Sequence, residues 1–257
     1  LERLTPALPQ VGCFDTAFHH TQPRLAQILP LPRAFGEEGF VRYGFHGLSY
    51  AYIASVLPQF SARARGRVIV AHLGSGASLC AMRDLRSVAT SMGFTSLDGL
   101  MMGTRSGAID PGLVLHLIGE RGMSVREVSD LLNKRSGLLG VSGLSNDLRV
   151  LEKAGTPEAE EAMALFAWRA AREIGSAMVA VGGLDVLVFT AGIGEHSATM
   201  RARICEYLGF AGVRLDAAAN EAHAPRISAA DSAVEVLATP TDEEIMIARG
   251  ARDVLAG

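Results

Sequence analysis

Cysteine is scarce in this sequence, aromatic residues are few, and long apolar runs and blocks of like charge are missing. The three cysteines, Cys13, Cys80 and Cys205, are odd in number and widely separated. This spacing provides no CxxC metal pair and no disulfide framework. We therefore expect three free thiols that are buried or half-buried.

The charge balance and the hydrophobic runs exclude several classes of partner. The chain has 24 Lys and Arg residues and 27 Asp and Glu residues, with a formal net charge of -3, so no electrostatic footprint for nucleic acid or an anionic membrane is visible. The longest apolar runs, such as Val186 to Phe189, fall far short of the roughly 20 residues of a membrane span. No signal-peptide pattern opens the chain, and we expect a cytoplasmic protein. The absence of an initiator Met indicates a piece of a longer protein.

What is present is the composition and patterning of an α/β protein. The 257 residues are 49% hydrophobic and 20% charged, as in ordinary globular proteins. Strand-like apolar runs alternate with helical patterns, which favours an α/β fold. Val68 to Ala71 and Leu79 to Met82 bracket Gly74-Ser75-Gly76, which predicts a hairpin with a tight glycine turn. Val186 to Thr190 is a further strand, and it runs into the glycine-containing residues 191–194.

Two helices have clear start signals. Ser124 and Glu127 have the spacing of a capping box, and Thr156 followed by Pro157 offers an N-cap and an N1 proline. The second helix should run to about Val181. One of its faces carries Met163, Phe166, Ala167, Ala170, Ile174 and Ala177. We expect this stripe to form core or a subunit interface rather than a ligand site.

Glycine-rich segments at strand ends are candidate ligand sites, because open α/β sheets expose backbone amides there. In residues 68–82, the Gly-Ser-Gly turn can bring bare N–H groups against a phosphate, although such hairpins are often purely structural. In residues 91–112, glycines and methionines precede Arg105. A loop arginine of this kind suits bidentate binding of phosphate or carboxylate oxygens. The alternative is an ordinary surface arginine.

Two later segments have the same character. In residues 184–197, Ala191-Gly192-Ile193-Gly194 follows a strand, so a base or ribose can lie close to the backbone and a helix N-terminus can favour an anion. The segment is not a GxGxxG fingerprint. In residues 239–250, Thr241 and Glu244 have capping-box spacing. That interpretation leaves Asp242 and Glu243 as the freer carboxylates for a metal.

Polar side chains near the start of the chain lie among aromatic residues. Residues 14–20 read FDTAFHH and residues 42–50 read RYGFHGLSY. The candidates here are Asp15, His19, His20 and His46, although a histidine beside Phe and Tyr is usually structural.

Taken in order, these segments resemble the acetate kinase family from about Val11 to the last residues. The matching motifs are FDTAFH, RYGFHG, HLGSGAS, SMGFT followed by GLMMGTRSG, FTAGIGE and PTDEE. The resemblance implies the fold of the sugar kinase, Hsp70 and actin superfamily, in which two ribonuclease-H-like α/β domains close over ATP and substrate. It also implies that most of the first domain is absent. Residues 1–67 would end that domain, residues 68–243 would form the second, nucleotide-binding domain, and residues 244–257 would be a helix returning to the first.

The resemblance further implies an activity and a set of site residues. The activity is reversible phosphoryl transfer from ATP to acetate, giving acetyl phosphate and ADP, with Mg²⁺ (or Mn²⁺) as the metal and a homodimer formed through the second domain. Arg105 would bind the carboxylate and the transferring phosphoryl group, His72 would stabilise that group, and His46 would position it. Asp15 would act near the metal, which Glu243 would hold. The nucleotide would contact His72, Gly74, Ser75, Gly76, Asp147, Gly192, Ile193 and Gly194.

The chemistry fits that inventory, because a carboxylate is already deprotonated and needs no general base. Charge on the phosphate must instead be stabilised by positive donors and metal, and no Ser-His-Asp or Cys-His arrangement stands out. Family members usually have Asn at position 75, Pro at 96 and Asn at 242, where this chain has Ser75, Ser96 and Asp242. The alternatives are a propionate kinase, a nucleotide-binding fragment that is inactive without its first domain, and an Hsp70-like or actin-like ATPase.

Overall fold

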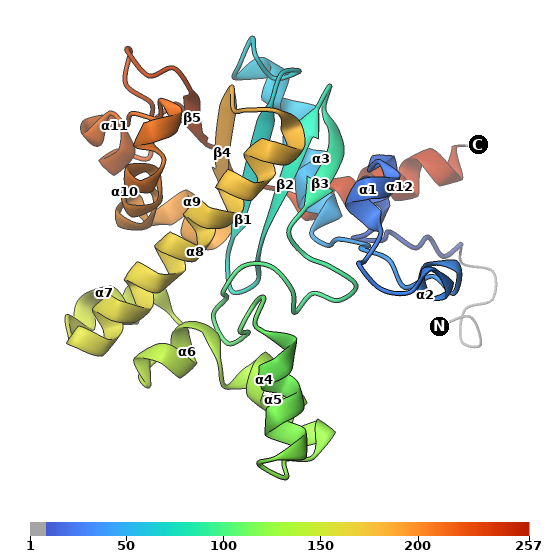
Figure 1. The fold of residues 1–257 in the computed structure, drawn as a ribbon. Helices are drawn as coiled ribbons and strands as arrows, with labels where there is room; N and C mark the ends of the chain where they lie inside the picture. Colours follow the sequence, from blue (N-terminus) through green and yellow to red (C-terminus); the bar gives the residue numbers. More distant parts are fainter. Residues whose placement is uncertain (1–8, 257) are drawn as a thin grey trace.

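A computed structural model describes residues 9–256 of the chain, and a five-stranded sheet organises its fold (Figure 1). The strands are β1 (Val68–Leu73), β2 (Ala77–Arg83), β3 (Arg86–Thr90), β4 (Val186–Thr190) and β5 (Glu235–Ala238). The helices are η1 (Ala17–Thr21), α1 (Arg24–Gln27), α2 (Arg33–Glu37), α3 (Gly47–Val56), η2 (Leu57–Gln59), α4 (Pro111–Gly119), α5 (Val125–Lys134), α6 (Gly137–Ser142), α7 (Leu148–Ala154), α8 (Pro157–Val181), α9 (Ala191–His196), α10 (Ala198–Tyr207), η3 (Gly209–Ala211), α11 (Ala217–Glu221) and α12 (Glu243–Leu255).

The sheet has the order β3-β2-β1-β4-β5 and mixed strand directions. β2 is antiparallel to both β1 and β3, whereas β1, β4 and β5 are parallel to one another. The predicted hairpin is confirmed, with Gly74 to Gly76 as its turn. The carboxyl ends of β1 and β4 meet at one edge of the sheet, because Val68 pairs with Val186 and His72 with Thr190.

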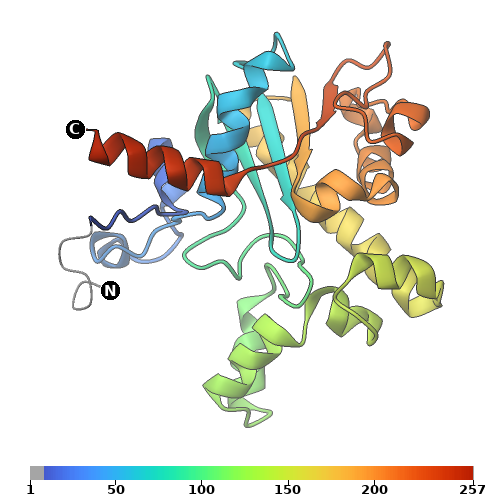
Figure 2. The ribbon, with the colours of Figure 1, turned by 180° about the vertical axis from the view of Figure 1, so that it is seen from behind.

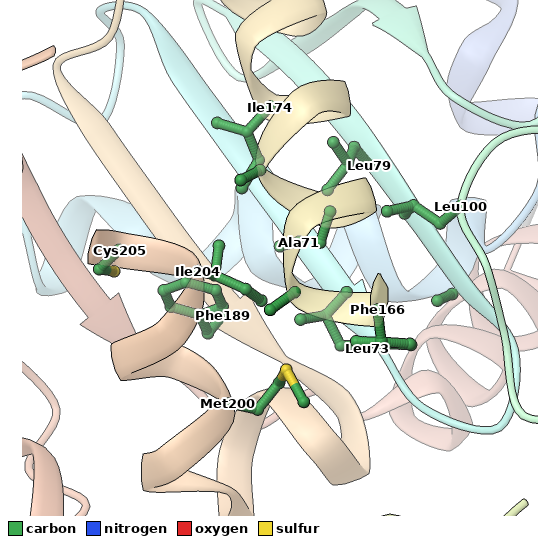
Figure 3. Packing of buried hydrophobic residues seen from close by; sticks show 14 of the residues in the cluster. Ala71, Leu73, Leu79, Leu100, Phe166, Ile174, Phe189, Met200, Ile204 and Cys205 are labelled. Carbon is green, nitrogen blue, oxygen red and sulfur yellow. The ribbon is translucent and has the colours of Figure 1, made fainter. Parts of the chain in front are cut away.

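Helix α8 covers one face of the sheet and crosses it diagonally (Figure 1). Alternate β1 residues, among them Ala71 and Leu73, pack there with Phe166 and Ile174 of the helix (Figure 3). Most of the apolar stripe predicted on this helix is buried within the chain. The stripe is therefore core, and the suggestion that it contributes to a subunit interface was wrong.

Helix α3 covers the opposite face, with α12 beside it (Figure 2). The other β1 residues, Val68 and Val70, pack there against Tyr50 and Ile53 of α3. Because side chains alternate along a strand, His72 belongs to this second face. The alternation thereby directs a polar side chain toward α3 at the end of β1.

The predicted N-terminal capping is confirmed for two helices and is wrong for one. The Ser124–Glu127 capping box is present, and the Thr156 side chain caps α8. The predicted Thr241–Glu244 capping box was wrong: Asp242 is the N-cap of α12 and its carboxylate accepts from the Ile245 N–H at 2.9 Å. An aspartate accepts such a bond readily, so Asp242 is less available for a metal than the sequence suggested.

The remaining expectations concern thiols, membranes and domains. Cys80 and Cys205 are buried and Cys13 is half-buried, and all three are free. Within residues 9–256, no helix is both long and apolar enough to cross a membrane. The division of the chain at residues 67 and 243 stays a prediction, although strand β1 does begin at Val68 and α12 at Glu243.

Candidate active site

The site begins at the end of β1, where the glycines of the hairpin turn leave the backbone uncovered by side chains. His72 pairs with Ser78 across the hairpin, so both side chains point to the α3 face. The His72 Nδ1 atom lies 2.8 Å from the Ser49 hydroxyl of α3. The ring is thus anchored at one nitrogen, next to the glycine turn.

His46 is placed by an unusual backbone conformation at the start of α3. It is the N-cap of that helix and has a φ of 57°, a left-handed conformation that is costly for a residue with a side chain. The following residue, Gly47, donates its N–H to the Asp15 carbonyl at 2.8 Å. A Cβ at Gly47 would lie 2.1 Å from that oxygen, so only glycine permits this contact. The contact fixes the Asp15 segment against His46.

The two histidines form a stacked pair. Their ring centroids are 4.0 Å apart and the ring planes are inclined by 16°. Burial lowers the pKa of His46 to about 4. Burial, together with the neighbouring His46, lowers the pKa of His72 to about 3. Both imidazoles are therefore neutral near pH 7 and can act as hydrogen-bond donors or acceptors without carrying charge.

Arg105 supplies the positive charge beside this pair. The guanidinium donates to the Ser96 carbonyl at 2.8 Å, and burial lowers its pKa while leaving it charged at any ordinary pH. A Cβ added at Gly76 would lie 3.0 Å from Arg105 Nη2 and 3.2 Å from His46 Nε2. The glycine therefore gives both side chains access to the same small space.

Two carboxylates, Asp15 and Glu243, act electrostatically on this region, and the charge of Asp15 opposes the lowering of the His46 pKa. Burial raises the pKa of Glu243, and the charge of Asp15 raises it further. Within the described residues, no group of three His, Cys, Asp or Glu side chains is close enough to hold a metal ion alone. Mg²⁺ commonly uses one or two protein carboxylates and completes its shell with water and phosphate oxygens. Two like charges of this kind fit that mode of binding.

A cavity of about 480 Å³ lies next to the glycine turn. Gly74 and Ser75 border it on one side, and Asp147, Gly192 and Ile193 on the other. The residues expected to lie between β4 and a later helix are themselves helical, since α9 begins at Ala191. Asp147 caps α7 and pairs with Arg149. Of the residues that the resemblance assigned to the nucleotide, Gly74, Ser75, Asp147, Gly192 and Ile193 line this one cavity, whereas His72, Gly76 and Gly194 are not among its lining residues.

Two side chains that the sequence did not single out hold the α9 segment in place. The Glu195 carboxylate accepts from the backbone N–H of Ala191 at 2.8 Å and from that of Thr241 at 3.2 Å. Arg201, which is fully buried, donates to the carbonyls of Gly194 and Glu195. No recognised sequence motif marks these two residues, because their backbone partners become apparent only in the folded chain.

The remaining histidine candidates are structural. His19 is buried, with its ring nitrogens bonded to the Ser87 hydroxyl and the Phe45 carbonyl. His20 is exposed and bonds the Ala17 carbonyl within its own turn. Neither histidine matches the environment of the stacked pair.

Comparison with known proteins agrees with this geometry. The model of the acetokinase family matches residues 1–249. The chain belongs to the acetokinase family. It is 57% identical to an acetate kinase of Rhodopseudomonas palustris (strain ATCC BAA-98 / CGA009) over 97% of its own length, and it spans 64% of that relative.

Solved structures confirm the fold. An acetate kinase of Porphyromonas gingivalis superposes with a TM-score of 0.90 at 41% identity, over 99% of this chain and 66% of that one. A propionate kinase of Francisella tularensis also has a TM-score of 0.90, at 39% identity over 97% of this chain and 65% of that one. The fold is therefore the predicted ribonuclease-H-like, actin-like ATPase fold. The chain spans less than two thirds of its curated relatives, including the one from Rhodopseudomonas palustris.

Proposed function

We propose that this site carries out the acetate kinase reaction, the reversible transfer of a phosphoryl group between ATP and acetate. The observation that carries the proposal is the convergence of the Arg105 guanidinium and His46 Nε2 on Gly76, with His72 stacked on His46. A charged fork and two neutral imidazoles at a turn without side chains suit the oxygens of a phosphoryl group. Membership of the acetokinase family and the acetate kinase relatives support the same reaction.

The proposed chemistry is an in-line displacement. A carboxylate oxygen of acetate attacks the γ-phosphorus, and the bond from that phosphorus to the β–γ bridging oxygen breaks, which gives acetyl phosphate and ADP. Acetate is ionised at neutral pH, so no side chain has to remove a proton. Arg105 would hold the anions together, and His46 and His72 would donate to the equatorial oxygens, where charge spreads in the transition state.

A metal and a nucleotide have matching places in the proposal. Glu243 would hold Mg²⁺ or Mn²⁺, directly or through water, with Asp15 close by, and the ion would supply charge neutralisation at the phosphates. The raised pKa of Glu243 beside a second acid indicates a carboxylate that a cation would stabilise. Adenosine would occupy the cavity bordered by Asp147, Gly192 and Ile193, and the phosphates would extend over the glycine turn. The cavity is about 480 Å³, in the usual range for a small-molecule site.

The acyl group is the finer part of the proposal, and propionate is the alternative to acetate. Ser96, whose carbonyl accepts from Arg105, stands where family members usually have proline. One methylene in an apolar pocket is worth only about 1–3 kcal/mol, and a propionate kinase has the same fold. We propose acetate because the curated relatives that we compared are acetate kinases.

The first experiment is a calorimetric titration of the 257-residue chain with ATP and Mg²⁺, followed by a hydroxamate assay for acetyl phosphate with acetate present. Binding is expected, and Arg105→Ala should abolish any turnover while Arg214→Ala, which alters an exposed arginine, should not. Binding without turnover would favour the nucleotide-binding fragment. In that case, the part of the Rhodopseudomonas palustris relative that this chain does not cover should restore turnover when added. Failure to bind ATP would contradict the proposal, as would normal turnover in Arg105→Ala.

We propose that the protein pairs as a homodimer through residues 68–243. The stripe on α8 is core, so the contact must use another surface. Helices α4 and α5 project from the body in both views (Figures 1 and 2), and Leu113, Leu115 and Val125 are exposed there. Sedimentation equilibrium should give twice the mass of one chain. If α4 and α5 form the contact, Leu115→Glu should reduce the measured mass to that of one chain. A monomeric wild-type chain would contradict the proposal.

A further inference from the structure

Both stacked histidines are anchored through the same ring atom to a buried serine hydroxyl. His46 Nδ1 lies 2.9 Å from Ser78 Oγ, and His72 Nδ1 lies 2.8 Å from Ser49 Oγ. Both serines have no exposed surface. A neutral imidazole carries one hydrogen, so whichever way each serine hydroxyl points decides which nitrogen of its histidine is the donor.

The direction of the first hydrogen bond follows from Tyr50. This tyrosine is fully buried, and its hydroxyl bonds the Ser78 hydroxyl. Among the described residues, Ser78 is its only hydrogen-bond partner. If Ser78 donated to Tyr50, the tyrosine hydrogen would be buried without an acceptor, which is costly. Tyr50 therefore donates to Ser78, Ser78 donates to His46 Nδ1, and the hydrogen of His46 is left on Nε2.

The second hydrogen bond follows from the same accounting. Within residues 9–256, the Ser49 hydroxyl bonds only His72 Nδ1. If His72 donated from Nδ1, the Ser49 hydrogen would have no acceptor in a fully buried position. Ser49 therefore donates, and His72 also carries its hydrogen on Nε2.

His46 Nε2 is the ring atom that faces the space beside Gly76 and Arg105. His46 Nε2 would lie 3.2 Å from a Cβ at Gly76, where Arg105 Nη2 would lie 3.0 Å away. In the described part of the chain, neither His46 nor His72 has a hydrogen-bond partner at Nε2.

We propose that Ser78 and Ser49 are positioning residues that hold His46 and His72 in the Nε2–H tautomer, with Tyr50 donating to Ser78, and that the two histidines are thereby neutral donors for anionic phosphoryl oxygens. The assignment to phosphoryl oxygens rests on the proposed function, whereas the tautomers do not. The arrangement separates two tasks: the serines set the direction of donation, and Arg105 supplies the charge. It also makes the stacking tolerable, because two neutral rings at 4.0 Å do not repel as two imidazolium ions would.

The test is a long-range ¹H–¹⁵N NMR spectrum of the ¹⁵N-labelled 257-residue chain near pH 7, which reports the protonated nitrogen of each imidazole. We expect both histidines as Nε2–H. Ser78→Ala should raise the Nδ1–H fraction of His46 by about tenfold, the equivalent of one hydrogen bond, without changing His72. Ser49→Ala should do the reverse. Ser78→Thr, which keeps the hydroxyl, should restore the Nε2–H form of His46. Tyr50→Phe should leave His46 as Nε2–H, because Ser78 would then have only His46 as an acceptor, as Ser49 has only His72.

The outcomes separate this inference from the proposed function. Nδ1–H histidines in the wild-type chain, or tautomers unaffected by Ser78→Ala and Ser49→Ala, would overturn it. The wild-type spectrum by itself keeps the test decisive if a serine variant does not fold. Inorganic phosphate, or ATP with Mg²⁺, should then shift the Nε2–H signals of both rings. If the tautomers are as expected and neither ligand shifts those signals, the positioning role stands and the role toward phosphoryl oxygens fails.

Discussion

Acidification should destabilise the folded chain through its stacked histidines, because both imidazoles are held neutral when the chain is folded. The folded pKa is about 4 for His46 and about 3 for His72, against an ordinary value of 6.5. A depressed histidine pKa means that protons bind preferentially to the unfolded chain. Above about pH 6.5, each histidine is neutral in both states and costs the folded chain no stability. As the pH falls from there toward the folded pKa, the folded chain loses stability relative to the unfolded chain.

The magnitude follows from these values. At about pH 5, protonation favours the unfolded form of each histidine by about 2 kcal/mol, whereas the folded form binds almost no proton. Two histidines together give about 4 kcal/mol, a large share of the roughly 5–15 kcal/mol that stabilises a typical domain. Glu173 and Glu243, whose pKa values are raised mainly by burial, act in the opposite direction at acid pH. The difference between wild type and a histidine variant removes that common contribution.

Urea denaturation followed by circular dichroism measures this difference. Between about pH 7.5 and about pH 5, His72→Gln should lose about 2 kcal/mol less unfolding free energy than the wild type. His116→Gln, which alters an exposed residue of α4, is the matched control and should behave as wild type. If His72→Gln lost as much stability on acidification as the wild type, the claim that this ring is neutral and desolvated would be refuted.

Three further predictions concern the segments that hold the site and helix α8. Arg201→Met should lower the unfolding free energy by about 3 kcal/mol, because it leaves Asn220 and two α9 carbonyls buried without their donor. Urea denaturation measures this change, and a loss below about 1 kcal/mol would contradict the prediction. Gly107→Ala should destabilise the arginine loop, since Gly107 has a φ of +67° and a Cβ there would lie 2.3 Å from the Leu100 carbonyl. Gly175→Ala, where a Cβ meets nothing within 4 Å, should instead stabilise α8 by up to about 1 kcal/mol in the same measurement.

The features that the sequence predicted well are those set by neighbouring residues. The hairpin around Gly74 to Gly76 depends on a local glycine turn, and the start of α8 depends on Thr156 and the following proline. The N-cap of α12 was misplaced by one position. Thr241 and Asp242 are both good capping residues, and the choice between them depends on how the preceding chain leaves the sheet.

The features that the sequence did not predict are those formed by distant residues. The stacking of His46 on His72 requires the left-handed backbone at His46 and the side-chain alternation of β1 to meet at the N-terminus of α3. Neither motif contains that information. The sequence did not single out Ser49 and Ser78 for the same reason. Nothing in the local sequence distinguishes a serine that bonds a distant histidine from any other serine in a helix or strand.

The two kinds of donor at the site imply different responses to substitution. Arg105 contributes charge, so Arg105→Lys should preserve part of the attraction for an anion but lose the bidentate fork. The neutral histidines contribute direction. Under the proposed function, protonating both rings would add two positive charges beside Arg105, and a charge that binds ground-state phosphate as strongly as the transition state does not accelerate transfer. An uncharged N–H that is already aimed costs no reorganisation as charge develops on the phosphoryl oxygens, so a site of this kind needs the buried serines as much as the imidazoles they hold.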